Sequence, residues 1–277
     1  MAAPLNQVFF PATFQELFSA WGRFDSAVPY AGGTGLIRDQ GRRTLELPPV
    51  ILSLDKLEDL QRISRSERYL EIGAMVKLSQ IIRLGKIVPE AFRDCLENIA
   101  GAQLRNIATI GGNICYPAGR LDASAALTAL DAQYELRSAQ SSRWISASRF
   151  SSLPGPTALK DQELLTRVRI PLDQWNYSVY KKFSKGRRGN GGVVVFLVKT
   201  QKNALTDIRV VYKTAAILRD KNSEAILAGK QLPLSRRVAA EFVENWETFL
   251  SGIQDLDELS QKELLNFIEM NVYNLTE

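Results

Sequence analysis

Histidine is absent from all 277 positions of the sequence. This absence excludes Ser-His-Asp and Cys-His catalysis, zinc sites of the HExxH type and a flavin attached through histidine. Cysteine is nearly absent too, because only Cys95 and Cys115 occur and no CxxC pair exists. We therefore expect no disulfide framework, no cysteine-based zinc site and no iron–sulfur cluster held by this chain.

Long apolar runs and the standard nucleotide-binding loops are also missing. The longest apolar stretches, such as Val193 to Val198, are too short to cross a bilayer, and the N-terminus has no basic region followed by an apolar run. We therefore expect a cytoplasmic protein that does not span a membrane. Arg38 stands where a GxGxxG fingerprint has its third glycine, and neither GxxxxGKS nor GxxxxGKT occurs.

The composition is that of an ordinary globular protein, with 45% hydrophobic and 23% charged residues. The length favours two domains, or one large domain with an appendage. The net charge of +5 is modest for a chain of this size. Five cations between Lys181 and Arg188 leave a basic nucleic-acid-binding module open as an alternative, but no recognisable nucleic-acid motif surrounds them.

Hydrophobic periodicity predicts strands and helices that alternate irregularly, without the even rhythm of a doubly wound parallel sheet. Strands are predicted at residues 27–30, 69–72, 177–182, 193–199 and 208–211. Helices are predicted at residues 11–21, 57–63, 78–84 and 122–130, and in two later segments around Trp246 and Ile268. A domain boundary is predicted near Pro171, before a C-terminal domain of sheet and helices.

The first segment that indicates chemistry follows a predicted strand and has three glycines within four positions. Without side chains to obstruct it, such a backbone can approach a ligand closely, and successive N–H groups in a turn suit a pyrophosphate. An ordinary tight turn is the alternative. This first glycine segment consists of Tyr30, Ala31, Gly32, Gly33, Thr34, Gly35 and Leu36.

The second segment is a Gly-Gly pair flanked by Thr109 and Asn113, with Asp122 nine residues further on. Backbone donors and short polar side chains in this arrangement suit phosphate and ribose hydroxyls, and the aspartate can accept from a sugar hydroxyl. A β-bulge at the glycines and a helix N-cap at the aspartate are the alternatives. We refer to residues 109–113 as the second glycine segment.

Four motifs occur in a characteristic order along the chain: AGGTG, QLRNIATIGGN with Asp122 downstream, ELLTRVRIP and YKKFSKGRR. In this order and spacing, the sequence resembles the FAD-binding subunits of the xanthine dehydrogenase and carbon monoxide dehydrogenase family over nearly its whole length. The resemblance implies an α+β fold of the p-cresol methylhydroxylase type. It implies an FAD-binding domain over residues 1–172, with subdomains of about 1–55 and 56–172, and a smaller C-terminal domain over 173–277.

The resemblance also implies a non-covalent FAD and a set of residues that bind it. The first glycine segment would cradle the pyrophosphate, Asp122 would hold the adenosine half, and Lys182, or less favourably Lys181, would approach the electron-rich side of the flavin. No side chain need act as an acid, base or nucleophile. The implied FAD-binding residues are Tyr30, Ala31, Gly32, Gly33, Thr34, Gly35, Leu36, Thr109, Gly112, Asn113, Cys115, Asp122, Leu165 and Lys182.

By resemblance, the chain is an electron-transfer subunit of a molybdenum hydroxylase-type oxidoreductase. It would take electrons from an iron–sulfur subunit, in a complex that also holds a molybdenum-cofactor subunit, and pass them to NAD, oxygen or another acceptor. A stand-alone FAD oxidoreductase of the same fold and a basic module without flavin are the alternatives. The sequence departs from the family pattern at Gly35, at Leu121 and in the stretch from Cys115 to Arg120.

Overall fold

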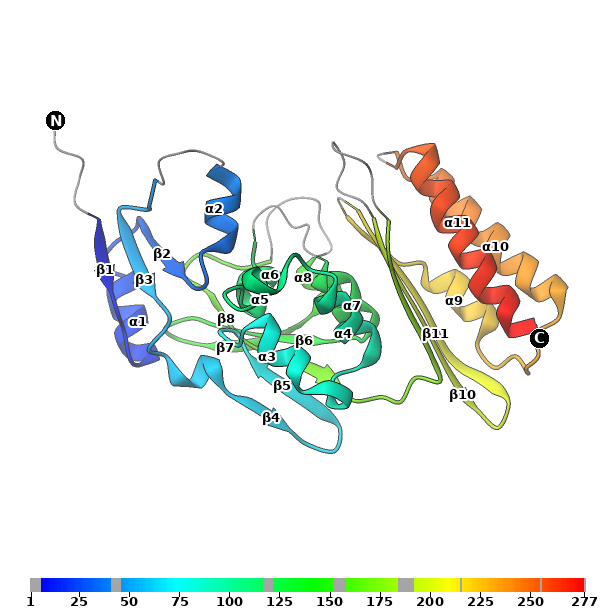
Figure 1. Cartoon of the computed structure of the whole chain (residues 1–277), viewed down its shortest axis with the longest axis horizontal. Coiled ribbons are helices and arrows are strands. Elements are labelled where there is room, and N and C mark those ends of the chain that lie inside the picture. Colours follow the sequence, from blue (N-terminus) through cyan, green and yellow to red (C-terminus); the bar gives the residue numbers. More distant parts are fainter. Residues whose placement is uncertain are drawn as a thin grey trace.

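The computed structural model describes residues 6–40, 46–116, 122–151, 158–183, 192–214, 216–254 and 256–276. In this part of the chain, strands form three separate sheets that follow one another along the long axis of the molecule (Figure 1). Helices pack on each sheet, so that the described residues build layers of sheet and helix. The α+β class expected from the resemblance is confirmed.

The N-terminal sheet has three parallel strands in the order β1-β3-β2. These strands are β1 (Gln7–Phe9), β3 (Val50–Ser53) and β2 (Ala27–Tyr30). Helix α1 (Phe14–Trp21) packs against this sheet through apolar side chains that recur at helical spacing. Helix α2 (Thr34–Gln40) follows β2 and begins within the first glycine segment.

The central sheet has five antiparallel strands in the order β4-β5-β8-β6-β7. They are β4 (Ile63–Arg65), β5 (Tyr69–Gly73), β8 (Leu164–Pro171), β6 (Gln133–Arg137) and β7 (Ser142–Ser146). Short helices gather on one side of this sheet (Figure 1). These are α3 (Leu78–Arg83), α4 (Glu90–Glu97), α5 (Ala102–Arg105), α6 (Ile110–Ile114), α7 (Ala123–Ala129) and α8 (Ala147–Phe150), with 3-10 turns at η1 (Glu58–Gln61) and η2 (Gly85–Ile87).

The C-terminal sheet has four antiparallel strands in the order β12-β11-β10-β9. They are β12 (Ile217–Leu218), β11 (Ala204–Lys213), β10 (Val193–Gln201) and β9 (Tyr177–Lys182). The outer face is covered by α9 (Lys221–Leu227), α10 (Arg236–Ser251) and α11 (Glu258–Tyr273), and η3 (Asn274–Thr276) ends the described chain (Figure 1). The inner face contacts α4 and α7 of the central part.

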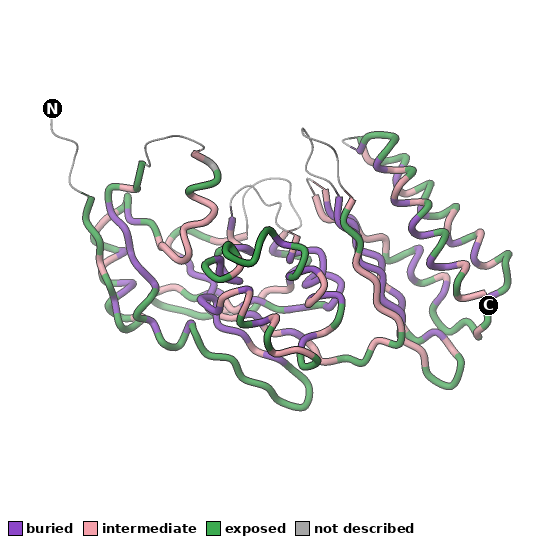
Figure 2. The backbone as a smooth tube through the Cα atoms, in the orientation of Figure 1, coloured by how far each residue is buried: buried purple, intermediate pink, exposed green. Residues whose placement is uncertain are grey.

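Strand β10 is apolar on both faces because each face belongs to a different core. Val193, Val195 and Leu197 pack into the core shared with the central helices. The alternate residues Val194, Phe196 and Val198 pack against the C-terminal helices. Figure 2 shows this strand among the buried segments of the C-terminal sheet.

Most predicted elements are confirmed within a few residues, including β2, β5, β9 and the two C-terminal helices. The predicted helix over 57–63 is partly wrong, because only a 3-10 turn forms and Ile63 begins strand β4. The predicted boundary near Pro171 falls at the end of β8, and the division into domains stays a prediction. Among the described residues, no helix is long and apolar enough to cross a membrane.

Candidate functional site

The first glycine segment links strand β2 to helix α2 by a sharp turn. Tyr30 ends the strand, and Thr34 begins the helix. Between them Gly33 has a φ of +65°, a left-handed conformation that side chains with a Cβ rarely adopt. A Cβ on Gly33 would also overlap the Tyr30 hydroxyl group. The turn therefore requires glycine at this position.

The second glycine segment forms helix α6 and the residue that caps it. The Thr109 hydroxyl accepts a hydrogen bond of 3.0 Å from the backbone N–H of Gly112. The Gly-Gly pair lies inside the helix, so the alternative of a β-bulge is wrong. Asn113 is buried, and no described residue donates a hydrogen bond to its Oδ1 atom. A buried acceptor of this kind is available to a ligand.

The first glycine segment lies in direct contact with the residues just before the second, although about 75 residues separate them in the sequence. A Cβ on Gly32 would overlap the backbone carbonyl oxygen of Ile107, two residues before Thr109. Glycine at position 32 therefore permits the first segment to approach the second. The contact supports one shared site built from both segments.

A cavity of about 320 Å³ opens beside this contact. Its lining includes four residues that the resemblance implies for FAD binding, namely Ala31, Gly112, Cys115 and Leu165. The sequence did not indicate several other described lining residues, among them Trp21, Leu54, Met75, Leu159 and Lys160. They come from separate elements, and no local sequence signal joins them. Mostly apolar walls with a few polar groups are typical of small-molecule sites.

Cys115 contributes an uncharged thiol to the lining. It is half-buried at the end of α6, and burial raises the pKa of its thiol to about 12. The thiol is therefore protonated at neutral pH and is a poor nucleophile. Its role in the cavity is contact rather than covalent chemistry, as is that of the buried Leu165 side chain on β8.

An ion pair that the sequence did not reveal supports the wall of the cavity. Arg143 donates two hydrogen bonds to the buried carboxylate of Glu163, at 2.6 and 2.7 Å. The backbone N–H of Lys160 donates a third at 3.0 Å. The Arg143 guanidinium holds the pKa of Glu163 below its usual range. The pair fixes residues 160–165, which run along the cavity, onto strand β7.

Asp122 and Lys182 form an ion pair of 2.7 Å between the central part and the C-terminal sheet. Asp122 stands at the N-cap position of α7, as the alternative of a helix cap predicted, but its side chain makes no capping hydrogen bond. In the register of β9 and β10, Lys182 pairs with Val193 and faces the central helices. Lys181 pairs with Val194 and lies on the opposite face. Neither Asp122 nor Lys182 is among the described residues that line the cavity.

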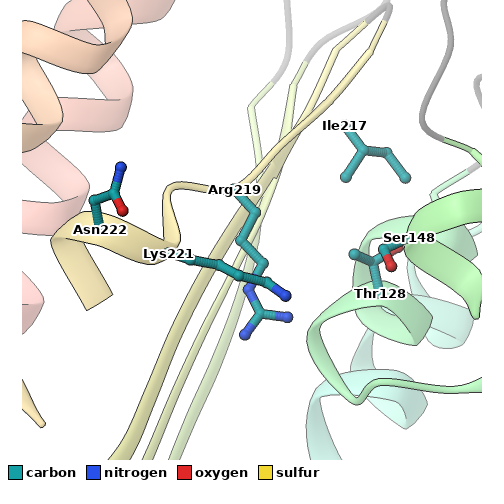
Figure 3. Close-up of a pocket in the computed structure, with 6 residues that line it drawn as sticks. All are labelled: Thr128, Ser148, Ile217, Arg219, Lys221 and Asn222. Atoms are coloured by element: carbon teal, nitrogen blue, oxygen red, sulfur yellow. The ribbon is translucent and has the colours of Figure 1, made fainter. Parts of the chain in front are cut away.

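A second pocket, of about 290 Å³, lies where α7 and α8 face the segment from β12 to α9. Figure 3 shows Thr128 and Ser148 on one side and Arg219 and Lys221 on the other. Arg219 is already hydrogen-bonded to the carboxylate of Glu224 at 2.9 Å. None of the implied FAD-binding residues is among its described lining residues. This pocket belongs to the contact between the central and C-terminal parts.

Some sequence-based expectations fall outside the described residues. These are the departures at Arg120 and Leu121, and the basic residues Lys185, Arg187 and Arg188. Of the departures, Gly35, Cys115 and Tyr116 are described.

The two glycine segments and the cavity beside them define a small-molecule-binding site on an α+β framework. Residues 4–173 match the family described as FAD binding domain in molybdopterin dehydrogenase. Because this span covers more than half of the chain, the chain belongs to that family, and FAD is its cofactor. It is an oxidoreductase flavoprotein, as the resemblance predicted.

Similar proteins include chains of oxidoreductases from bacteria, archaea and plants. The glyceraldehyde dehydrogenase medium chain of Sulfolobus acidocaldarius is 31% identical over 192 residues, which cover 68% of this chain and 68% of that one. The nicotine 6-hydroxylase medium subunit of Paenarthrobacter nicotinovorans is 27% identical over 92% of this chain and 91% of its own length. Xanthine dehydrogenase 2 of Arabidopsis thaliana is 29% identical over 79% of this chain, a span that is 18% of that longer protein.

Two solved structures share the fold over nearly the whole length. Quinoline 2-oxidoreductase from Pseudomonas putida 86 has a TM-score of 0.79 at 22% identity, covering 100% of this chain and 97% of that chain. Reconstituted CO dehydrogenase from Oligotropha carboxidovorans has a TM-score of 0.81 at 20% identity, covering 99% and 97%. These likenesses confirm the predicted fold.

Proposed function

We propose that the chain is the FAD-binding electron-transfer subunit of a molybdenum hydroxylase-type oxidoreductase. It receives electrons from an iron–sulfur subunit, in a complex with a molybdenum-cofactor subunit, and passes them to NAD, oxygen or another acceptor. The observation that carries the proposal is the alignment of 92% of this chain with 91% of a protein named as a medium subunit. The match supports a role as one subunit of a larger assembly.

The residues of the two glycine segments fit a dinucleotide. Ala31 and Gly112 line the cavity with little or no side chain, so a pyrophosphate can approach their backbone closely, and the Asn113 Oδ1 atom is an acceptor without a described partner that suits a sugar or ribitol hydroxyl. When bound, FAD supplies the redox chemistry, and the protein supplies its position and the surrounding charge. We therefore assign the non-covalent FAD to the cavity beside the two glycine segments, Tyr30 to Leu36 and Thr109 to Asn113.

The ion pair of Asp122 and Lys182 limits which part of FAD these residues can contact. The resemblance assigns the aspartate to the adenosine half and the lysine to the flavin, yet their charged atoms are 2.7 Å apart. One ion pair cannot contact both ends of an extended dinucleotide. We propose that both lie at the flavin end, because a lysine cation stabilises charge on an electron-rich flavin and has no matching anion at adenine.

We expect Asp122→Ala to weaken FAD binding by about 1 to 3 kcal/mol, because it removes a charged hydrogen-bond partner and leaves Lys182 unpaired. Titration of the ligand-free protein with FAD, followed by flavin fluorescence, measures the change. Asp173→Ala is the matched control, because it removes a similar ion pair with Lys199 at 2.9 Å, and FAD affinity should be unchanged. Equal affinity in the wild type and Asp122→Ala would contradict the assignment.

The assembly is tested by purifying the tagged chain from its native cell, followed by mass spectrometry and metal analysis. We expect two partners to co-purify, with iron, sulfide and molybdenum in the complex. The isolated chain should bind FAD but oxidise no substrate of the complex, and the flavin should be reduced by that substrate only when the partners are present. A metal-free homo-oligomer that oxidises a small substrate would reject this proposal in favour of a stand-alone flavoenzyme.

A further inference from the structure

Helix α2 makes an aromatic contact with Tyr116, three residues after the second glycine segment. The Tyr116 ring packs directly on the backbone of Gly35, the second residue of α2. A Cβ on Gly35 would lie 2.6 Å from two ring carbons of Tyr116, Cδ2 and Cε2. Real Cβ atoms do not approach ring carbons so closely, since carbon atoms pack at about 3.5 to 4.0 Å. Glycine at position 35 is therefore required by the ring.

Within the part of the chain that the structure describes, the helix that begins at Thr34 has few other contacts that could fix it in place. It is seven residues long, and helices of this length are unstable by themselves. None of its described side chains is buried, and Ile37 is 56% exposed. At its far end, the Gln40 side chain accepts a hydrogen bond of 2.7 Å from the Glu46 backbone N–H. The position of its first turn therefore depends strongly on Tyr116, which is buried.

The first glycine segment contacts residues on both sides of the second glycine segment. On one side, Gly32 contacts the Ile107 carbonyl group, and on the other, Gly35 contacts the Tyr116 ring. These contacts lie on either side of Gly33, the residue in the left-handed conformation. Tyr116 follows Cys115, which lines the cavity. The ring is therefore one of two contacts that fix the position of the first glycine segment beside the cavity.

We infer that Tyr116 is a positioning residue for FAD, acting through Gly35. Its ring holds the first turn of α2 at the distance from α6 that the dinucleotide requires. The contact requires a flat apolar ring, so Phe can replace Tyr in this role, whereas a small side chain cannot. This inference rests on the proposed assignment of FAD to the two glycine segments.

The test is a double-mutant cycle with Gly35→Ala and Tyr116→Ala, using FAD affinity as the measure. Gly35→Ala should weaken FAD binding about tenfold in the wild type, because the new Cβ displaces the ring. In the Tyr116→Ala background the same change should cause no loss, since the ring is gone and alanine favours a helix more than glycine. Tyr116→Ala alone should also weaken binding about tenfold, and Tyr116→Phe should bind within about twofold of the wild type.

A matched pair elsewhere separates positioning from general stability. Tyr212 packs on Gly192 in the C-terminal sheet in the same manner and is fully buried. Tyr212→Leu should lower the thermal midpoint and leave FAD affinity unchanged. Tyr116→Leu should raise the FAD dissociation constant and leave the thermal midpoint of the ligand-free protein nearly unchanged. If Tyr116→Ala does not fold, Tyr116→Leu, which also lacks the ring, replaces it as the second background of the cycle.

Equal effects of Gly35→Ala in both backgrounds would overturn the inference, as would a Tyr116→Leu variant with wild-type affinity. Loss of affinity in proportion to stability, equally at Tyr116 and Tyr212, would also overturn it. Gly33→Val checks the assignment of FAD to the segments independently. If that variant loses FAD while Gly35 and Tyr116 show no coupling, the positioning role alone is wrong. If Gly33→Val retains FAD, the assignment itself is wrong, and the inference is wrong with it.

Discussion

Gly33→Val should reduce FAD affinity more than about hundredfold, equivalent to about 2.7 kcal/mol or more. Two effects combine at this position. The φ of +65° is strained for any residue with a Cβ and most for a β-branched one, and the new side chain would overlap the Tyr30 hydroxyl group. The turn must therefore change where the backbone would approach the pyrophosphate. Equilibrium dialysis of the ligand-free variant against FAD measures the loss.

A second glycine with a positive φ serves as the control that separates the effect of backbone strain from the effect of losing the FAD site. Gly85, in η2, has a φ of +61°, and a Cβ there would meet nothing within 4 Å. Gly85→Val should therefore be destabilised by a similar backbone strain and keep its FAD affinity. Far-ultraviolet circular dichroism establishes that both variants are folded. A folded Gly33→Val protein with wild-type affinity would show that the first glycine segment is not the pyrophosphate site.

The sequence was a good guide to elements and a weaker guide to their ends. Strand β2 was predicted at its observed bounds because the glycines stop it abruptly. Helix α2 was not predicted, since Thr34 and Gly35 read as part of a turn and its side chains show no apolar face. Helical periodicity at Leu57, Leu60 and Ile63 was overridden when Ile63 paired with β5.

The implied site residues could be named from the sequence because they occur within short motifs. What joins them could not be predicted, because those contacts cross long sequence separations. Arg143 lies in β7, and Glu163, 20 residues later, directly precedes β8. Lys182 contacts Asp122 across 60 residues. The choice between Lys181 and Lys182 depended on the register with β10, which alternation alone does not fix.

Two departures from the family pattern turn out to be in contact. Glycine at position 35 and the aromatic residue at position 116 were noted separately in the sequence, with no indication of a connection. In the structure the Tyr116 ring occupies the space that a side chain at position 35 would need. The two departures are therefore sterically compatible, because the ring at position 116 leaves no room for a Cβ at position 35.

Arg143→Met should lower the free energy of unfolding by about 3 kcal/mol at pH 7, because it leaves the buried Glu163 carboxylate without its main partner. Urea unfolding followed by circular dichroism measures this value. Arg167→Met is the control: its partner Glu71 keeps a 2.7 Å ion pair with Arg169, and its more distant partner Glu135, at 3.7 Å, keeps a 2.9 Å hydrogen bond from Thr166, so the loss should stay below about 1 kcal/mol. A loss at Arg143 no larger than at Arg167 would contradict the importance of the buried pair.

The charge of Glu163 is responsible for this effect, and its pH dependence has a definite sign. Its pKa is lowered in the folded protein, so its contribution is complete above the usual carboxyl pKa of about 4.3 and disappears as pH falls through the lowered pKa. The difference in stability between the wild type and Glu163→Gln should therefore be largest near pH 7 and shrink below about pH 4. Arg143→Met with Glu163→Gln should be more stable than Arg143→Met alone, because no unpaired charge remains buried. If the double variant is less stable than Arg143→Met, the hydrogen bonds of Glu163, rather than its charge, hold residues 160–165 along the cavity.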